Sequence, residues 1–134
     1  MGTIEHVFAP LDREIEDLAQ KVIGAAIQVH KTLGPGFMES VYEESICIEL
    51  QKRGTPFQRQ HSVSLLYEGV RVGEARIDLL VDRRLIVELK AVEDLVKVHT
   101  AQTISYLRAA NLRLGLLINF NVPVLKDGIK RIIL

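Results

Sequence analysis

Three residues with the right chemistry for a metal site stand close together in the middle of the chain. Asp78 lies in one alternating segment, Glu88 and Lys90 lie in the next, and only the polar residues 82–84 separate the two segments. If residues 82–84 form a three-residue turn, the segments pair as antiparallel strands and Asp78 faces Glu88. Opposed Cβ atoms in such a pair are about 4.5–5.5 Å apart. The spacing therefore predicts two neighbouring carboxylates, with the ammonium group of Lys90 two residues along the same strand face and Arg76 opposite it.

Two opposed carboxylates need a partner that relieves their repulsion. Like charges directly opposite each other destabilise a sheet, so a cation, a proton or solvent has to compensate them. Mg²⁺ suits such a pair, because it takes one or two protein carboxylates and fills its other positions with water or phosphate oxygens. Lys90 could hold a metal-bound water or stabilise the charge that builds up on a phosphate.

Two plainer interpretations stay open at this level. In the first, the hairpin face is exposed and its charges pair diagonally, Asp78 with Lys90 and Glu88 with Arg76, in salt bridges that are worth little. In the second, the turn has two or four residues, and the two acids then lie on opposite faces of the sheet. The second arrangement would remove the metal site altogether.

A helix that precedes these strands carries a carboxylate that we expect to point inward. Glu39 lies in its first turn and shares one side with Ile46 and Leu50. An inward carboxylate needs a partner. The alternative is a charge that only stabilises the helix start through the helix dipole.

A later helix carries a polar stripe. His99, Gln102 and Tyr106 are expected to share one face, either as its solvated side or as groups that position a substrate phosphate. The opposite, apolar face is expected to consist of Ala101, Ile104 and Leu107.

The elements that hold these residues follow from the hydrophobic pattern. Apolar residues recur at steps of three and four behind Asp12, which predicts a long helix that residues 34–36 end. From Phe57 onward the period changes to two, which is typical of strands. The odd positions from Ala75 to Leu89 are expected to form one continuous apolar face. The predicted helices are at about 13–33, 37–53 and 96–111, and the predicted strands are at 58–67, 70–81, 85–91, 114–120 and 129–134. This order predicts an α/β sandwich around a mixed sheet.

The composition is that of one globular domain spanning residues 1–134, since the chain is 48% hydrophobic and 25% charged. The sequence has no apolar run long enough to cross a membrane and no secretory signal at its start, so we expect a reducing, cytoplasmic location. The one cysteine, Cys47, excludes an internal disulfide and is interpreted as a core thiol. His30 and His61 are interpreted as structural or surface residues rather than metal ligands.

The charge is unevenly distributed along the chain. The net charge is zero, but residues 1–49 carry a net −6 and residues 50–134 a net +6. Such a split can create a basic face for a polyanion, and a solvated surface of mixed charge explains it equally well.

Residues 36–42 read GFMESVY, which matches the G-x-x-E-x-x-Y signature of the small bacterial and archaeal GxxExxY proteins. That family is placed in the PD-(D/E)XK nuclease superfamily. Asp78, followed by the ELK sequence at 88–90, resembles the D…(E/D)-x-K core of this superfamily, with Ile77 in the place of the motif's proline. The resemblance implies a restriction-endonuclease-like α-β-β-β-α-β core over about residues 37–134, with an extra N-terminal helix.

The resemblance also implies a role for each matching residue of the acidic core. Asp78 and Glu88 would bind Mg²⁺, for which Mn²⁺ can substitute, together with the main-chain carbonyl of Leu89. Lys90 would orient or activate the attacking water. Glu39 would complete the site, through a water molecule or a second metal.

A further element resembles the Q-x-x-x-Y motif of the RecB-like branch of the superfamily. Gln102 and Tyr106 stand at that spacing, and the resemblance implies that they support the substrate or the acidic cluster.

The leading hypothesis is a Mg²⁺-dependent nuclease that acts on nucleic acid, with DNA favoured over RNA. A catalytically silent nucleic-acid-binding or adaptor module and an enzyme for a small phosphorylated molecule stay open. The apolar segment 129–134 could join the sheet or form a dimer contact, and association with a second copy or with a partner protein stays open. Candidates for contact with a phosphate backbone are Arg53, Arg59, Lys97, Arg108 and Arg113.

Overall fold

The computed structural model describes residues 10–134. Helix α2 (Arg13–Leu33) begins where the sequence predicts it, because the Asp12 side chain accepts a hydrogen bond from the Ile15 backbone N–H at 2.9 Å. Gly34 ends the helix with a φ of 69°, a left-handed value that glycine adopts without strain.

The turn after α2 is held by Tyr42, the tyrosine of the GFMESVY segment. Its hydroxyl donates to the Gly34 carbonyl at 2.6 Å and accepts from the Phe37 N–H at 3.2 Å. Its ring stacks on Phe120 with 4.5 Å between the ring centroids. Helix α3 (Glu39–Lys52) therefore starts two residues later than predicted, because the chain bends over residues 34–37. The same contacts fix the start of α3 and with it the position of Glu39.

The strands form one mixed sheet in the order β1-β2-β3-β4-β5. β3 and β4 are parallel, and the other neighbouring pairs are antiparallel. The remaining elements are β1 (Phe57–Tyr67), β2 (Val70–Val81), β3 (Leu85–Lys90), α4 (Lys97–Ala110), β4 (Leu114–Asn119), the 3-10 helix η1 (Leu125–Gly128) and β5 (Ile129–Ile133).

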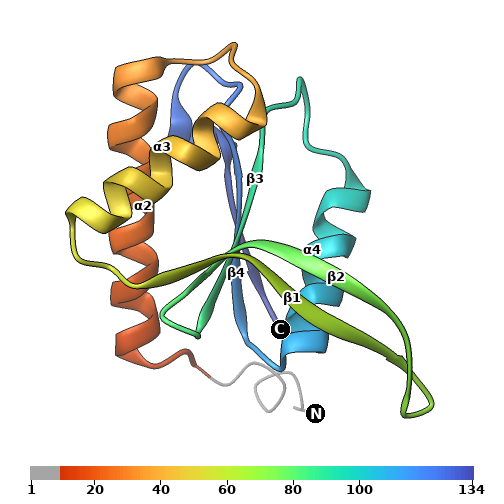
Figure 1. The fold of residues 1–134 in the computed structure, drawn as a ribbon. Helices are drawn as coiled ribbons and strands as arrows, with labels where there is room; N and C mark the ends of the chain where they lie inside the picture. Colours follow the sequence, from red (N-terminus) through yellow and green to blue (C-terminus); the bar gives the residue numbers. More distant parts are fainter. Residues whose placement is uncertain (1–9) are drawn as a thin grey trace, which may run out of the picture.

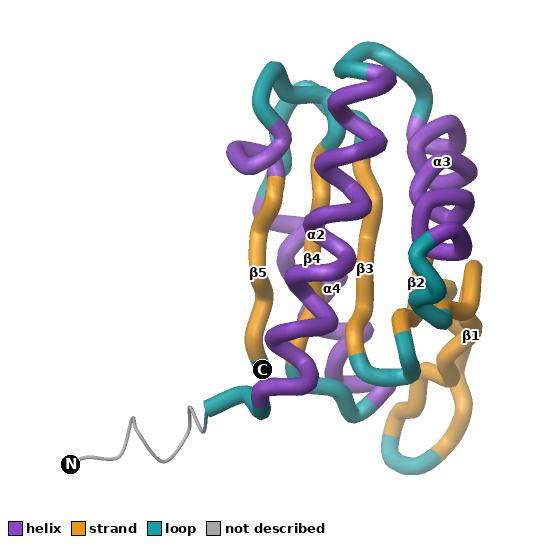
Figure 2. The backbone as a smooth tube through the Cα atoms, turned by 90° about the vertical axis from the view of Figure 1, so that its left-hand side faces the viewer, coloured by secondary structure: helices purple, strands orange, loops and turns teal. Residues whose placement is uncertain are grey.

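Helices cover both faces of this sheet (Figures 1 and 2). α2 and α3 lie on one face, and α4 lies on the other. Each side has its own hydrophobic cluster, with Leu79 and Val87 packed toward α2 and α3, and Leu80 and Ile86 packed with Leu107 of α4. The predicted α/β architecture, a mixed sheet between helices that include an N-terminal one, is confirmed. The C-terminal segment joins the sheet as β5.

The turn between β2 and β3 has the predicted three residues. Val81 pairs with Leu85, and Asp82 and Arg83 both take left-handed φ values, of 49° and 58°. The alternative turns of two or four residues are therefore wrong, and Asp78 and Glu88 stay in the register that brings them to the same level of the sheet.

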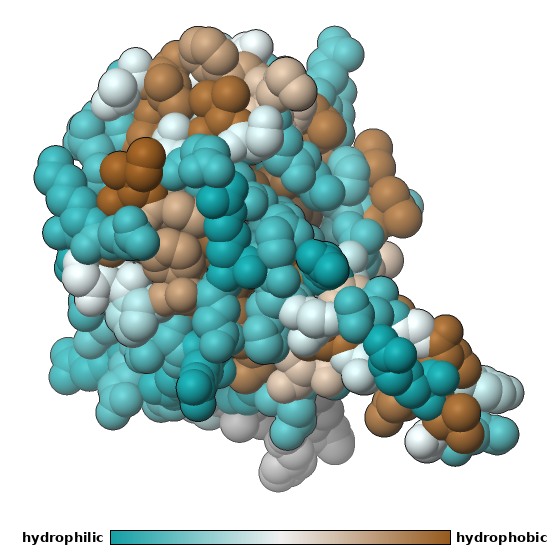
Figure 3. Space-filling view, in the orientation of Figure 1, coloured by the Kyte–Doolittle hydropathy of each residue, from teal (hydrophilic) through white to brown (hydrophobic). Residues whose placement is uncertain are grey.

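The β1–β2 hairpin leaves the rest of the sheet partway along its length (Figure 1). β2 pairs with β3 only over Leu79–Val81, although it is paired with β1 along most of its length. The outer part projects from the body, and its tip carries an apolar surface (Figure 3). The exposed apolar side chains at this tip are Leu66, Tyr67, Val70 and Val72.

One prediction about the hairpin is wrong. We expected the odd positions of β2 and β3, from Ala75 to Leu89, to form one continuous apolar face. Ile77 instead packs in the α4-side cluster, whereas Leu79 and Val81 pack toward α2 and α3. The reason is the departure of β2 from β3, which turns the outer hairpin relative to the sheet.

Two sequence interpretations outside the site are confirmed. Cys47 is a free thiol in the core, and burial raises its pKa. His30 is buried with its Nε2 atom 2.8 Å from the Val122 carbonyl, as expected of a structural histidine. Along residues 10–134, none of the helices has the length and apolarity that crossing a membrane requires.

Candidate active site

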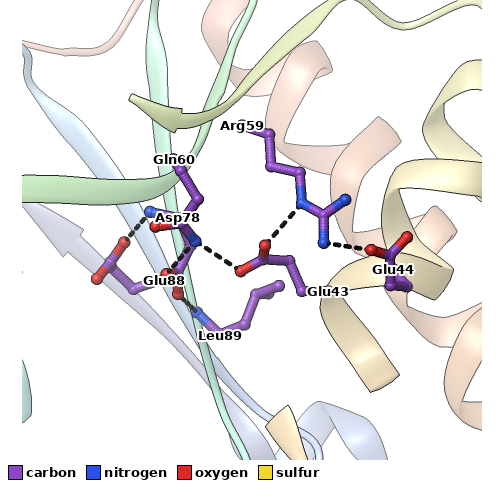
Figure 4. A network of polar contacts seen from close by, with 7 residues as sticks. All are labelled: Glu43, Glu44, Arg59, Gln60, Asp78, Glu88 and Leu89. Carbon is purple, nitrogen blue, oxygen red and sulfur yellow. Dashed lines mark hydrogen bonds and ion pairs between the residues drawn. The ribbon is translucent and has the colours of Figure 1, made fainter. Parts of the chain in front are cut away.

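The predicted acid pair lies where β2 and β3 separate. The backbone ladder ends at Leu79 and Val87, and at the next position side chains replace the backbone rungs (Figure 4). A Glu88 carboxylate oxygen accepts from the Asp78 N–H at 2.7 Å, and an Asp78 carboxylate oxygen accepts from the Leu89 N–H at 2.9 Å. We call the point where β2 and β3 separate the fork. Each acid crosses the fork and binds the main chain of the opposite strand, which holds both carboxylates in place.

This geometry does not support the diagonal salt bridges. Within residues 10–134, neither Asp78 and Lys90 nor Glu88 and Arg76 form an ion pair. The expected placement of Arg76 opposite Lys90 is also wrong, because β2 no longer pairs with β3 beyond Leu79. Within residues 10–134, the carboxylates of Asp78 and Glu88 therefore face each other without an ion pair to a basic side chain.

Burial and mutual repulsion shift the acid pair toward protonation. Glu88 is only 4% exposed, and its burial, followed by the charge of Asp78, raises its pKa to about 8. Burial also raises the pKa of Asp78, and the hydrogen bond from Leu89 partly offsets that rise. The nearby charge of Lys90 lowers both pKa values by a smaller amount. A bound divalent cation would relieve the repulsion between these two carboxylates and would favour their ionised forms.

Glu39 and Tyr106 lie within electrostatic reach of this pair, from opposite faces of the sheet. Glu39 is half-buried; burial raises its pKa, Lys90 lowers it, and Asp78 raises it. Burial raises the pKa of Tyr106 as well, and Glu88 and Asp78 add to that rise. The structure therefore gathers both residues around the fork without a direct hydrogen bond to either acid.

The predicted division of α4 into a polar and an apolar face is wrong for Ala101 and Tyr106. Ala101, expected on the buried face, is exposed, whereas Tyr106 packs half-buried beside Ile104 in the α4-side cluster. Gln102 is exposed, and its side chain makes no hydrogen bond within the part of the chain that the structure describes. The buried stripe runs through Thr103 and Leu107, which turns Gln102 away from the sheet. His99, the third residue of the expected stripe, accepts a hydrogen bond from the Val96 N–H at the start of α4.

Sequence reasoning missed a polar network beside the acid pair (Figure 4). Arg59 of β1 donates from Nε to Glu43 at 2.7 Å and from a terminal nitrogen to Glu44 at 2.8 Å. Gln60 donates from Nε2 to Glu43 at 2.9 Å and to Asp78 at 3.3 Å. One signal could have found part of it, since Glu43 lies one helical turn after Glu39 on the same face of α3.

The segment that follows Lys90 is also held by a residue that sequence reasoning missed. Asn119, at the end of β4, is buried; its side chain accepts from the Val92 N–H at 3.0 Å and donates to the Val92 carbonyl at 2.9 Å. Phe120 donates its N–H to the Lys90 carbonyl at 2.9 Å. These bonds fix the end of β3 that carries Lys90.

The five basic residues named as phosphate contacts divide into three groups. Arg59 is held by the two glutamates of α3, and Arg53 pairs with Glu49 at 2.7 Å. Lys97 and Arg108 of α4 are exposed and form no ion pair within residues 10–134. Arg59 therefore has a structural role, because both of its ion pairs join β1 to α3. Arg113 bonds to the carbonyls of Leu134 and Pro10.

Comparison with known proteins identifies the family. Residues 16–132 match the family model described as PD-(D/E)XK nuclease superfamily. The match spans most of the chain, and the protein belongs to this superfamily. Searches of curated proteins and of solved structures found no match.

The superfamily implies a divalent metal, and the donor set at the fork fits one. Within residues 10–134, no three acidic, histidine or cysteine side chains converge closely enough to hold an ion by themselves. Asp78 and Glu88 nevertheless offer hard oxygen donors side by side, and each uses one carboxylate oxygen on the opposite main chain. Mg²⁺ needs no more than two carboxylates, since water or phosphate oxygens fill its other positions.

Proposed function

We propose that the protein is a Mg²⁺-dependent nuclease that hydrolyses phosphodiester bonds in nucleic acid, and that it belongs to the GxxExxY proteins within its superfamily. The observation that carries the proposal is the pair of crossed contacts of Asp78 and Glu88 at the fork, with Lys90 on the same strand as Glu88. The GFMESVY segment supports the narrower family, because Tyr42 fixes the turn that places Glu39.

Asp78, Glu88 and the Leu89 carbonyl would hold the ion. In a β-strand the N–H and C=O of one residue point to the same side. The Leu89 N–H meets Asp78, so its carbonyl leaves β3 toward the same fork. Glu39 would reach the ion through water. When bound, Mg²⁺ supplies a Lewis acid for the phosphoryl oxygen and lowers the pKa of its water.

Lys90 would assist the attack of water on the phosphate. Its charge acts on Asp78, Glu88 and Glu39, yet it forms no ion pair with any of them. An ammonium group in that place would orient the attacking water and stabilise the charge that develops on the phosphate. Tyr106 would support the acid pair from the α4 side.

The proposed substrate is nucleic acid, with DNA favoured over RNA. Lys97 and Arg108 would contact the phosphate backbone, and the exposed Gln102 would act only by contact with bound substrate. The whole chain, residues 1–134, would act as one domain. The proposed location is the cytoplasm, where a thiol such as Cys47 stays reduced.

Cleavage of single- and double-stranded DNA and RNA in Mg²⁺ or Mn²⁺, beside mononucleotides, tests this function. We expect the wild type to cut a polymer and Lys90→Ala to lose at least about a hundredfold in rate, because positioned acid–base and electrostatic groups contribute that much. Lys21→Ala is the matched control, which removes the same charge from the exposed side of α2 and should keep the rate within about threefold.

Three results would contradict the proposal. Equal cleavage by wild type and Lys90→Ala would remove the role of Lys90. Hydrolysis of nucleotides alone would indicate an enzyme for a small phosphorylated molecule. No hydrolysis of any of these substrates would favour a silent binding or adaptor module.

A further inference from the structure

Gln60 has a backbone conformation that a strand residue does not normally adopt. Its φ is 51°, in the left-handed region, although it lies inside β1 and is not glycine. The flanking pairs, Arg59 with Leu79 and His61 with Ile77, keep one register, but Gln60 and Asp78 between them are not paired. The strain therefore falls on the one β1 residue that faces Asp78, and strained backbone of this kind gathers at functional sites.

The conformation brings the Gln60 side chain between two carboxylates from different elements. Its Nε2 atom donates to Glu43 of α3 at 2.9 Å and to Asp78 of β2 at 3.3 Å (Figure 4). Ionised carboxylates only accept hydrogen bonds, so the amide must present its NH₂ group to both. The orientation of the Gln60 amide thus follows from its partners.

Glu43 itself cannot move freely. One of its oxygens accepts from Gln60, and the other accepts from Arg59, which also binds Glu44. Glu43 is therefore held at both oxygens and serves as a fixed anchor for the amide. The chain of contacts leads from α3 through Gln60 to the carboxylate of Asp78.

A neutral hydrogen-bond donor holds Asp78 without cancelling the negative charge that a cation would need. A lysine or arginine in contact with Asp78 would compensate its negative charge and compete with a cation. An amide satisfies one oxygen of Asp78 and leaves that charge available.

The same residue marks the point at which the hairpin turns. Phe57 and Val81, on the inner side of Gln60, pack toward α2 and α3, whereas Val63 and Ile77, on its outer side, pack toward α4. The left-handed residue therefore lies where the hairpin changes sides, and β-bulges mark the places where strands are re-aimed in the same way.

We infer that Gln60 is a positioning residue that ties Asp78 to the Glu43 anchor and so sets the geometry of the metal site. The inference rests on the proposed function, because it assigns Gln60 to the metal site proposed at Asp78. Gln60 touches neither the reacting atoms nor the ion, and it acts through Asp78.

Mn²⁺ titration of three variants tests this role. Gln60→Met keeps the length of the side chain and its backbone demand but removes the donor, and Gln60→Gly removes the donor while tolerating the left-handed backbone. We expect the affinity for Mn²⁺ to fall at least about tenfold in both, which is the usual effect of removing a residue that orients a metal ligand. Asn111→Gly is the matched control, since Asn111 is also left-handed (φ 56°) but ends α4. It should bind Mn²⁺ like the wild type.

The possible failures are distinguishable. Affinity within about twofold of wild type in either Gln60 variant would overturn the role of the amide. If the wild type itself shows no saturable binding of Mn²⁺, the proposed function fails instead. The Gln60–Asp78 contact is then judged by melting temperatures of Gln60→Met, Asp78→Asn and the double variant. Losses that simply add would overturn the contact as well.

Discussion

Asp78→Asn is expected to abolish the stabilisation of the protein by Mg²⁺ or Mn²⁺ and to lower cleavage on the order of a thousandfold or more. The asparagine carbonyl can still accept from the Leu89 N–H, so the fork keeps its hydrogen bond. The variant loses the negative charge that would hold the ion and the oxygen that accepts from the Gln60 amide. The Lewis-acid contribution of a bound metal is worth several kcal/mol, which corresponds to a rate effect of this size.

The matched control for Asp78→Asn is Asp82→Asn. Asp82 lies in the exposed turn between the same two strands, and its left-handed φ of 49° suits asparagine. The control makes the same change in net charge, and we expect both the metal response and the cleavage rate to stay at wild-type values. Melting curves with and without Mn²⁺ give the first readout. A full metal response in Asp78→Asn would place the metal elsewhere.

Glu88→Gln is expected to abolish cleavage and to stabilise the protein above neutral pH. The pKa of Glu88 is raised from 4.5 to about 8, so between these values the folded state holds more protons than the unfolded state. The free energy of unfolding therefore falls as the pH rises through that range, by an amount on the order of a few kcal/mol. Glutamine carries no charge and can still accept from the Asp78 N–H, so this loss should disappear.

Melting temperatures measured from about pH 4.5 to about pH 9 check this prediction. We expect Glu88→Gln to melt roughly 5–10 °C above the wild type at the alkaline end, and the gap to close at the acidic end. Glu93→Gln, an exposed glutamate in the loop before α4, should show no such pH-dependent gap. A gap of the same size at both ends would mean that the effect comes from packing and not from the ionisation of Glu88.

The acid pair could be predicted because its position depends on local rules. The alternation of β2 and β3 and the polar residues 82–84 together fix the register, and the three-residue turn with Val81 opposite Leu85 agrees with it. The start of α2 followed in the same way from Asp12 as an N-cap. Each of these features is decided by neighbours in sequence.

The network beside the acid pair could not be predicted, because its key residue violates the local preference. Glutamine is not a residue that favours left-handed backbone, so nothing in the alternation of β1 indicates a break at Gln60. Without that break, Arg59 and Gln60 look like ordinary strand residues, and their contacts with Glu43 are invisible. Tertiary contacts decide this conformation.

The face of α4 was mispredicted for a related reason. Hydropathy favours Ala101 over Thr103 as a core residue, yet Thr103 is buried and Ala101 is exposed. A methyl group of Thr103 would lie 3.0 Å from a Cβ added at Gly115, so the threonine fills the space that this glycine leaves on β4. The Thr103 hydroxyl bonds to the His99 carbonyl within the helix, which makes its burial inexpensive. Pairings of this kind depend on the sheet below the helix.

Anomalous diffraction from crystals of the wild-type protein grown with Mn²⁺ would locate the metal directly. We expect an anomalous peak at the fork between β2 and β3, where carboxylate oxygens of Asp78 and Glu88 and the Leu89 carbonyl would coordinate the ion, and no such peak in Asp78→Asn crystals. A Mn²⁺ ion bound elsewhere with the fork empty, or a peak at the fork that persists in Asp78→Asn, would contradict the proposed metal site.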